Sequence, residues 1–203
     1  ITERYGSVLI FDEVITGFRL SLGGAQEYYR VTPDMATLGK IIGGGMPLAA
    51  YCGKKEIMSM VSPSGPVYQA GTLSGNPAAV AAGIATLKLL FEKPDIYKEL
   101  DEKGAFLEKA CKEAIDRHKI RACVNRAGSL LSVFFTDGPV ESYRDVILSD
   151  TGRFAKAFSI LLDSGIYVAP SQFEAVFISL AHSGEDLART AEAIDRAFGA
   201  LGQ

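Results

Sequence analysis

A lysine and an acidic residue are the residues of this sequence with the clearest chemical potential. Lys40 lies in the apolar, glycine-rich run 37–45 without a charged neighbour, and Asp12 directly follows the apolar run 8–11. Pyridoxal phosphate needs a lysine amine that forms an imine and a carboxylate that keeps its ring nitrogen protonated. The pair therefore suits this cofactor, although a solvated loop lysine and a helix-capping carboxylate would give the same two residues.

The two residues need different environments for this chemistry. Lys40 must be uncharged when it attacks a carbonyl group and when it moves protons, and burial among apolar residues disfavours an ammonium ion. Its apolar neighbours in the sequence fit that need. Asp12 must stay ionised, whereas Glu13 would point to the opposite face of the same strand and is expected to be structural.

Strands of a parallel sheet are expected to position both residues. Residues 7–11 form a continuous apolar run, which is typical of a central parallel strand covered on both faces, and residues 35–38 indicate a second buried strand. Ligands of open α/β sheets gather at the carboxyl ends of the strands. Val14 could therefore place an apolar face against a flat ring, while Gly39 permits a tight backbone beside Lys40.

A segment rich in Ser, Pro and Gly, residues 62–77, is expected to be a loop. Gly71 and Thr72 in this loop offer a backbone N–H group and a hydroxyl to a phosphate oxygen. A plain connector would have the same composition, so the two interpretations stand side by side.

A helix is predicted after this loop, over residues 78–91. Asn76 is a typical N-cap and Pro77 a typical first-turn residue. The small residues of this helix imply close packing against another element: Ala78, Ala79, Ala82 and Gly83.

The pattern changes at Lys93-Pro94-Asp95, which predicts a boundary between domain 1–94 and domain 95–203. The second region is expected to be a small α+β domain, in the order α-β-α-β-β-α. Its predicted elements are helix 96–118, strand 128–135, helix 149–165, strand 166–168, strand 176–180 and helix 183–201.

Composition excludes several functional classes. The net charge of −3, without a basic stripe, argues against nucleic-acid binding. Three cysteines without CxxC spacing argue against a disulfide framework and a zinc site, and favour a reducing compartment. No apolar run is long enough to span a membrane. A cytoplasmic location is expected, or a plastid if the source is a plant.

Other catalytic motifs are missing from the sequence. GxGxxG after the first strand, GxxxxGK[ST] and GxSxG do not occur, and the cysteines have no evident histidine partner. His118 ends a charged helix and is expected at the surface. His182 follows a predicted strand and is a weak candidate for lining a site. The two histidines are not spaced as metal ligands, so no metal is expected.

Three segments together resemble the signature of the class III pyridoxal-phosphate aminotransferases. They are Phe-Asp-Glu-Val-Ile-Thr-Gly-Phe-Arg at 11–19, Thr-Pro-Asp at 32–34 and Leu-Gly-Lys-Ile-Ile-Gly-Gly-Gly at 38–45. Segments 68–77, 165–174 and 179–182 look like the aminomutase branch of that family. The resemblance covers essentially the whole chain.

The resemblance implies a role for each matching residue. Lys40 would carry the cofactor and transfer protons between substrate carbons, Asp12 would pair with the ring nitrogen, and Val14 would pack on the ring. Thr72, with Gly71, would reach the cofactor phosphate of the neighbouring subunit, which implies a homodimer with shared active sites.

The resemblance also implies fold, reaction and size. The fold would be the end of a fold type I large domain, mostly parallel sheet with helices, followed by a small α+β domain. Glu174 would lie near the substrate entrance. The implied reaction is isomerisation of glutamate-1-semialdehyde to 5-aminolevulinate, with pyridoxal 5'-phosphate or its pyridoxamine form. Because family members are about twice as long, and because strand 7–11 follows Ile1 almost at once, the chain is expected to need an N-terminal half of the same protein.

Two alternatives remain open at this point. The first is another class III aminotransferase, of the ω-amino-acid or ornithine type, against which loop 69–77 argues. The second is a non-catalytic piece that serves as a dimerisation module. Absorbance of a cofactor–lysine imine, and its loss in Lys40→Ala, would distinguish an enzyme from such a module.

Overall fold

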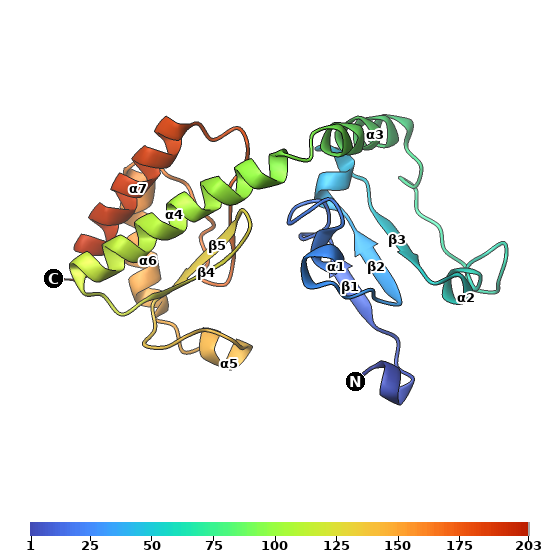
Figure 1. The fold of residues 1–203 in the computed structure, drawn as a ribbon, viewed down its shortest axis with the longest axis horizontal. Helices are drawn as coiled ribbons and strands as arrows, with labels where there is room; N and C mark the ends of the chain where they lie inside the picture. The colour runs from blue at the N-terminus through green and yellow to red at the C-terminus, as the bar shows by residue number, and fades with distance from the viewer. Residues whose placement is uncertain (203) are drawn as a thin grey trace. The chain divides into compact units, whose positions relative to one another are not determined.

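The computed structural model describes residues 1–202, and the chain divides into two compact units, Ile1–Tyr97 and Lys98–Gln203 (Figure 1). The division falls in the first turn of helix α4 (Ile96–His118), next to the boundary predicted at residues 94 and 95. Each unit contains a three-stranded sheet.

The sheet of the first unit has the order β1-β2-β3, with β1 parallel to β2 and β3 antiparallel to β2. The strands are β1 (Ile10–Glu13), β2 (Met35–Leu38) and β3 (Ala50–Gly53). The parallel pairing agrees with the prediction. The prediction of a central, doubly covered first strand is wrong for this chain, because β1 is an edge strand and the side chains of Val8 and Ile10 are each 54% exposed.

Five helices precede, connect or follow these strands along the chain. They are the 3₁₀ helices η1 (Glu3–Tyr5) and η2 (Lys40–Gly43) and the α-helices α1 (Gly24–Tyr29), α2 (Lys55–Met58) and α3 (Pro77–Glu92). Helix α3 begins as predicted, because the Asn76 side chain accepts a hydrogen bond from the Ala79 N–H at 3.1 Å and Pro77 occupies the first turn. Helix α1 was not predicted.

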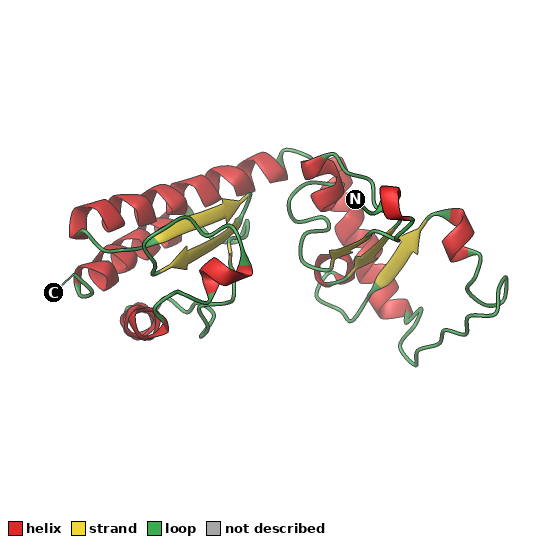
Figure 2. Cartoon of the chain, turned by 90° about the horizontal axis from the view of Figure 1, so that it is seen from below, coloured by secondary structure: helices red, strands yellow, loops and turns green. Residues whose placement is uncertain are grey.

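The second unit combines helices with a small sheet (Figure 2). The sheet is antiparallel, with the strand order β4-β5-β6. Besides α4, its elements are β4 (Cys123–Ala127), β5 (Leu130–Phe134), α5 (Tyr143–Val146), α6 (Thr151–Asp163), β6 (Val176–Phe177) and α7 (Gly184–Gly199).

Three details of this unit differ from the prediction. Strand β4 was not predicted, because its alternation is interrupted by Asn125 and by Arg126, whose guanidinium pairs with carboxylates of α4. The short helix α5 was also not predicted. Residues 166–168 form no strand, since Ile166 and Val168 pack on the core without a pairing partner in a sheet.

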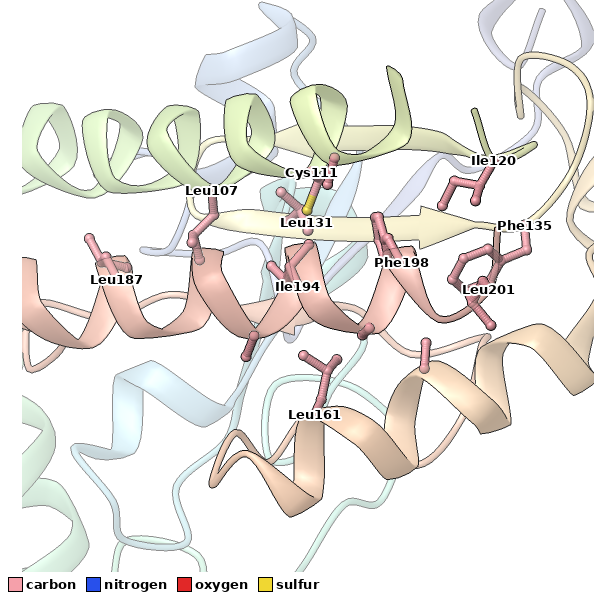
Figure 3. Close-up of a cluster of buried hydrophobic side chains, with 14 of the residues drawn as sticks. Leu107, Cys111, Ile120, Leu131, Phe135, Leu161, Leu187, Ile194, Phe198 and Leu201 are labelled. Carbon is pink, nitrogen blue, oxygen red and sulfur yellow. The ribbon is translucent and has the colours of Figure 1, made fainter. Parts of the chain in front are cut away.

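The core of the second unit is built by three helices and one strand (Figure 3). Helix α7 contributes most, and Ala193 and Ala197 on it are fully buried. Amphipathic periodicity of α4 and α7 predicts this arrangement, because apolar residues three and four positions apart share one face. The buried side chains include Leu107 and Cys111 of α4, Leu131 of β5, Leu161 of α6, and Leu187, Ile194 and Phe198 of α7.

Candidate active site at the ends of β1 and β2

Asp12 lies near the carboxyl end of β1, directly opposite Thr37 of β2 in the parallel register. Its Oδ1 accepts hydrogen bonds from the Val14 N–H at 3.1 Å and from the Thr37 hydroxyl at 3.2 Å. Asp12 is exposed, and within residues 1–202 no cationic side chain forms an ion pair with it. The carboxylate is therefore oriented by its neighbours and remains available to a cationic ligand.

Glu13 has the opposite environment, as the alternation of side chains along a strand requires. The residue is 1% exposed, and its carboxylate accepts hydrogen bonds from the Thr16 hydroxyl and from the N–H groups of Ala25 and Gln26. Burial by itself would raise the pKa of Glu13, but these hydrogen bonds outweigh it and hold the pKa below its ordinary value. The expectation that Glu13 is structural agrees with this geometry.

Lys40 is the first residue of η2, two positions beyond the end of β2. Its φ is +47°, in the left-handed region that residues with side chains seldom adopt. Lys40 is exposed in this chain, so the apolar enclosure expected from its sequence neighbours is not observed. Of those neighbours, Ile42 is itself buried, at 5% exposure.

Val14, which follows β1, packs against the residue that follows β2. A Cβ built on Gly39 would lie 3.3 Å from Val14 Cγ1, so Val14 packs against the backbone immediately before Lys40. The structure therefore brings three predicted residues, Asp12, Val14 and Lys40, to one edge of the sheet, where ligands of α/β folds gather.

This edge has the groups that pyridoxal phosphate requires. Asp12 presents a carboxylate oriented by two hydrogen bonds to a cationic ring N–H, Val14 presents an apolar surface, and Lys40 presents an amine that forms no ion pair within residues 1–202. The residues fit the cofactor on these grounds.

The other predicted site residues belong to other segments of the chain. Gly71 and Thr72 belong to an exposed loop, in which Tyr68 is 82% exposed and Leu73 57% exposed. Glu174 belongs to the second unit, is exposed, and donates its backbone N–H to the Ser171 carbonyl. Their proposed roles remain predictions.

Thr37 is a residue that sequence reasoning missed. Its hydroxyl fixes the Asp12 carboxylate. The signal would have been the pairing register, which places Thr37 opposite Asp12, but the sequence does not specify that register.

The described residues contain neither a membrane-spanning helix nor a cluster of metal ligands. Within residues 1–202 no helix has the length and apolarity needed to cross a membrane. In the same part of the chain, histidine, cysteine and acidic side chains form no group of three that could hold a metal ion.

Comparisons with known proteins identify relatives of this chain. The chain is 58% identical over 198 residues to a glutamate-1-semialdehyde 2,1-aminomutase of Pelotomaculum thermopropionicum, which covers 98% of this chain and 45% of the relative. The aminomutase of Thermus thermophilus is 54% identical, covering 97% of this chain and 46% of the relative. The chain thus spans about half the length of the curated relatives it matches.

Solved structures show the same fold. A β-phenylalanine aminotransferase from Variovorax paradoxus superposes with a TM-score of 0.89 at 32% identity, covering 99% of this chain and 46% of the other. A glutamate-1-semialdehyde aminomutase from Pseudomonas aeruginosa, in complex with PMP, has a TM-score of 0.86 at 24% identity, covers 98% of this chain and 46% of that one, and supports the fold alone. The fold is that of the α/β transaminases.

The family model named aminotransferase class-III matches residues 1–198, which is nearly the whole chain. Three of the five residues that the resemblance assigned to the cofactor, Asp12, Val14 and Lys40, lie at or next to the ends of β1 and β2. The chain belongs to the class III aminotransferase family.

Proposed function

We propose that this chain is the lysine-bearing part of a glutamate-1-semialdehyde 2,1-aminomutase, which converts glutamate-1-semialdehyde to 5-aminolevulinate. The observation that carries the proposal is the 58% identity to such an enzyme over 98% of the chain. The proposal includes an N-terminal half of the same protein, because the chain covers 45% of that relative.

The reaction moves an amino group from carbon 2 of the substrate to its aldehyde carbon. The amine form of pyridoxal phosphate, when bound, would supply the amino group for the aldehyde carbon and would accept the amino group of carbon 2. The Lys40 amine, Nζ, would remove the proton from carbon 2 and would deliver a proton to the aldehyde carbon.

Three further residues of the proposed site, Asp12, Thr37 and Val14, would orient the cofactor. The Asp12 carboxylate would pair with a protonated ring nitrogen, and the Thr37 hydroxyl donates a hydrogen bond that orients this carboxylate. Val14 would cover one face of the ring. An ionised Asp12 matters because a protonated ring withdraws electrons from the reacting carbons.

Assembly completes the proposed site. Thr72, with Gly71, would bind the cofactor phosphate of the neighbouring subunit in a homodimer, which agrees with the exposure of their loop. We infer that Ile1–Tyr97 is the end of the large cofactor-binding domain and that Lys98–Gln203 is the small C-terminal domain, in which Glu174 would serve the substrate entrance.

The test supplies glutamate-1-semialdehyde to the full-length protein without an amino acceptor. An aminomutase makes 5-aminolevulinate over many turnovers, whereas another class III aminotransferase stops after half a turnover. The structural likeness to a β-phenylalanine aminotransferase makes this second outcome the alternative to exclude. Production of 5-aminolevulinate in amounts well above the enzyme concentration supports the proposal.

Two lysine-to-alanine variants test the assignment of Lys40. Lys40→Ala should reduce turnover by about 10⁴-fold or more, because it removes both the attachment point and the proton carrier. Lys55→Ala, at an exposed position of α2, is the matched control and should keep the wild-type rate. After borohydride reduction, peptide mass analysis should place the pyridoxyl adduct on Lys40. An adduct on another lysine would refute the assignment.

A further inference from the structure

The turn that carries Lys40 is packed unusually closely against helix α3 (Figure 1). Gly83 of α3 is buried, and a Cβ at this position would collide with the Ile42 carbonyl oxygen and lie 2.7 Å from Leu48 Cδ2. In the opposite direction, a Cβ on Gly44 would collide with the Thr86 hydroxyl and lie 2.9 Å from the Ala82 carbonyl oxygen. The backbones of helix and turn therefore approach more closely than side chains would permit.

The backbone of Lys40 needs such support. A non-glycine residue at φ +47° is strained and keeps that conformation only where its surroundings enforce it. The local hydrogen bonds of the turn are short-range, from the Ile42 N–H to the Gly39 carbonyl at 3.2 Å and from the Gly44 N–H to the Ile41 carbonyl at 3.0 Å.

Two neighbours hold the turn from outside. Val14 packs against Gly39 on the side before Lys40, and α3 packs against Ile42 and Gly44 on the side after it. Lys40 lies between these supports. A shift of the Ile42 backbone would change the conformation of Lys40, because the hydrogen bond from the Ile42 N–H to the Gly39 carbonyl encloses Lys40 in the same turn.

We infer that Gly83 is a positioning residue for Lys40: by carrying no side chain, it lets α3 fix the turn so that the Lys40 amine is presented at the same edge as Asp12. The inference rests on the proposed function, because it concerns the reactivity of Lys40 toward the cofactor. It extends the site to a helix that contributes no reacting group.

Gly83→Ala is the variant that tests this inference. Alanine favours the helix intrinsically, so any loss arises from the contact with the turn. Gly104→Ala is the matched control, because a Cβ there would collide in the same way with the Gly128 carbonyl oxygen, but in the second unit. Gly184→Ala, where a Cβ would meet no atom within 4 Å, is the open control.

The readout is the rate at which added pyridoxal phosphate labels Lys40 in the full-length apoprotein. Borohydride traps the adduct, peptide mass analysis locates it, and urea unfolding is measured on the same samples. Gly83→Ala should slow labelling of Lys40 by about tenfold or more, because small displacements of a reacting group have large effects on rate. Gly104→Ala should shift the urea midpoint but keep labelling within about twofold of wild type, and Gly184→Ala should change neither.

The possible results separate the inference from the proposed function. Wild-type labelling in Gly83→Ala, or equal slowing in Gly104→Ala, would overturn the inference and leave the proposed function standing. A wild-type protein that carries no adduct on Lys40 would overturn both. If Gly83→Ala does not fold, Thr86→Leu perturbs the same contact through Gly44 from a half-buried position, and the same slowing is expected. Labelling at the wild-type rate in Thr86→Leu would then overturn the inference.

Discussion

The two adjacent carboxylates at the end of β1 lie in different environments, one suited to binding a ligand and the other to stabilising the fold. Asp12 is exposed and oriented by two hydrogen bonds, whereas Glu13 is 1% exposed and accepts hydrogen bonds from the first turn of α1. Because side chains alternate along a strand, neither residue can take the other's role. Glu13 also explains helix α1, since a buried anion at a helix N-terminus satisfies N–H groups that lack partners within the helix.

Replacement of Glu13 by glutamine should therefore destabilise the protein without removing a reacting group. We expect Glu13→Gln to lower the free energy of unfolding by about 2 kcal/mol, because an amide group cannot accept from all the N–H donors that face this carboxylate. Urea unfolding at pH 7 measures the effect. Glu56→Gln, an exposed position on α2, is the matched control and should change the stability little.

The same residue predicts a pH dependence. The folded-state pKa of Glu13 is lowered, so its contribution to stability is present above the ordinary pKa of 4.5 and is lost as the pH falls through the folded-state value. Wild-type protein should lose stability more steeply than Glu13→Gln below about pH 4.5. Parallel curves of unfolding free energy against pH for the two proteins would contradict this prediction.

At the scale of elements, helix α3 supports the lysine turn, and its first turn depends on one cap. Asn76→Ala should lower the free energy of unfolding by about 1 kcal/mol, because the Ala79 N–H loses the side-chain acceptor that lies 3.1 Å away. Asn76→Ser keeps an acceptor and should retain most of the stability. Thermal unfolding of both variants provides the measurement, and an equal loss in both would show that the cap is not the cause.

The elements also show what the sequence could predict. Helices α3, α4 and α7 were predicted within about one or two residues at each end, because caps and 3.6-residue periodicity are local signals. The placement of Asp12 and Lys40 at neighbouring strand ends was predicted from the apolar runs that precede these two residues, which are also local signals. Strand β4 could not be predicted because polar residues interrupt its pattern. The edge position of β1 and the role of Thr37 could not be predicted because pairing partners and register here depend on contacts distant in sequence.

At the scale of the whole molecule, the two units differ in how completely they bury apolar surface. The second unit contains a continuous core from α4, β5, α6 and α7. The first unit leaves apolar side chains open on β1 and on α3, with Ile10 at 54% exposure and Phe91 at 73%. A unit with its own core can fold alone, whereas exposed apolar surface favours association.

Residues 94–203, which retain the start of α4, should therefore fold when expressed alone. Cys111 provides an internal probe, because burial raises the pKa of its thiol to about 12 and leaves little thiolate at neutral pH. In the isolated fragment this thiol should resist alkylation at pH 8 until urea unfolds the chain in one cooperative step. Residues 1–94 alone should instead bind a hydrophobic dye and lack a cooperative transition, since Val8 and Ile10 remain uncovered. Rapid alkylation of Cys111 in the native fragment 94–203 would show that its core needs the rest of the protein, and would argue against an independent second domain.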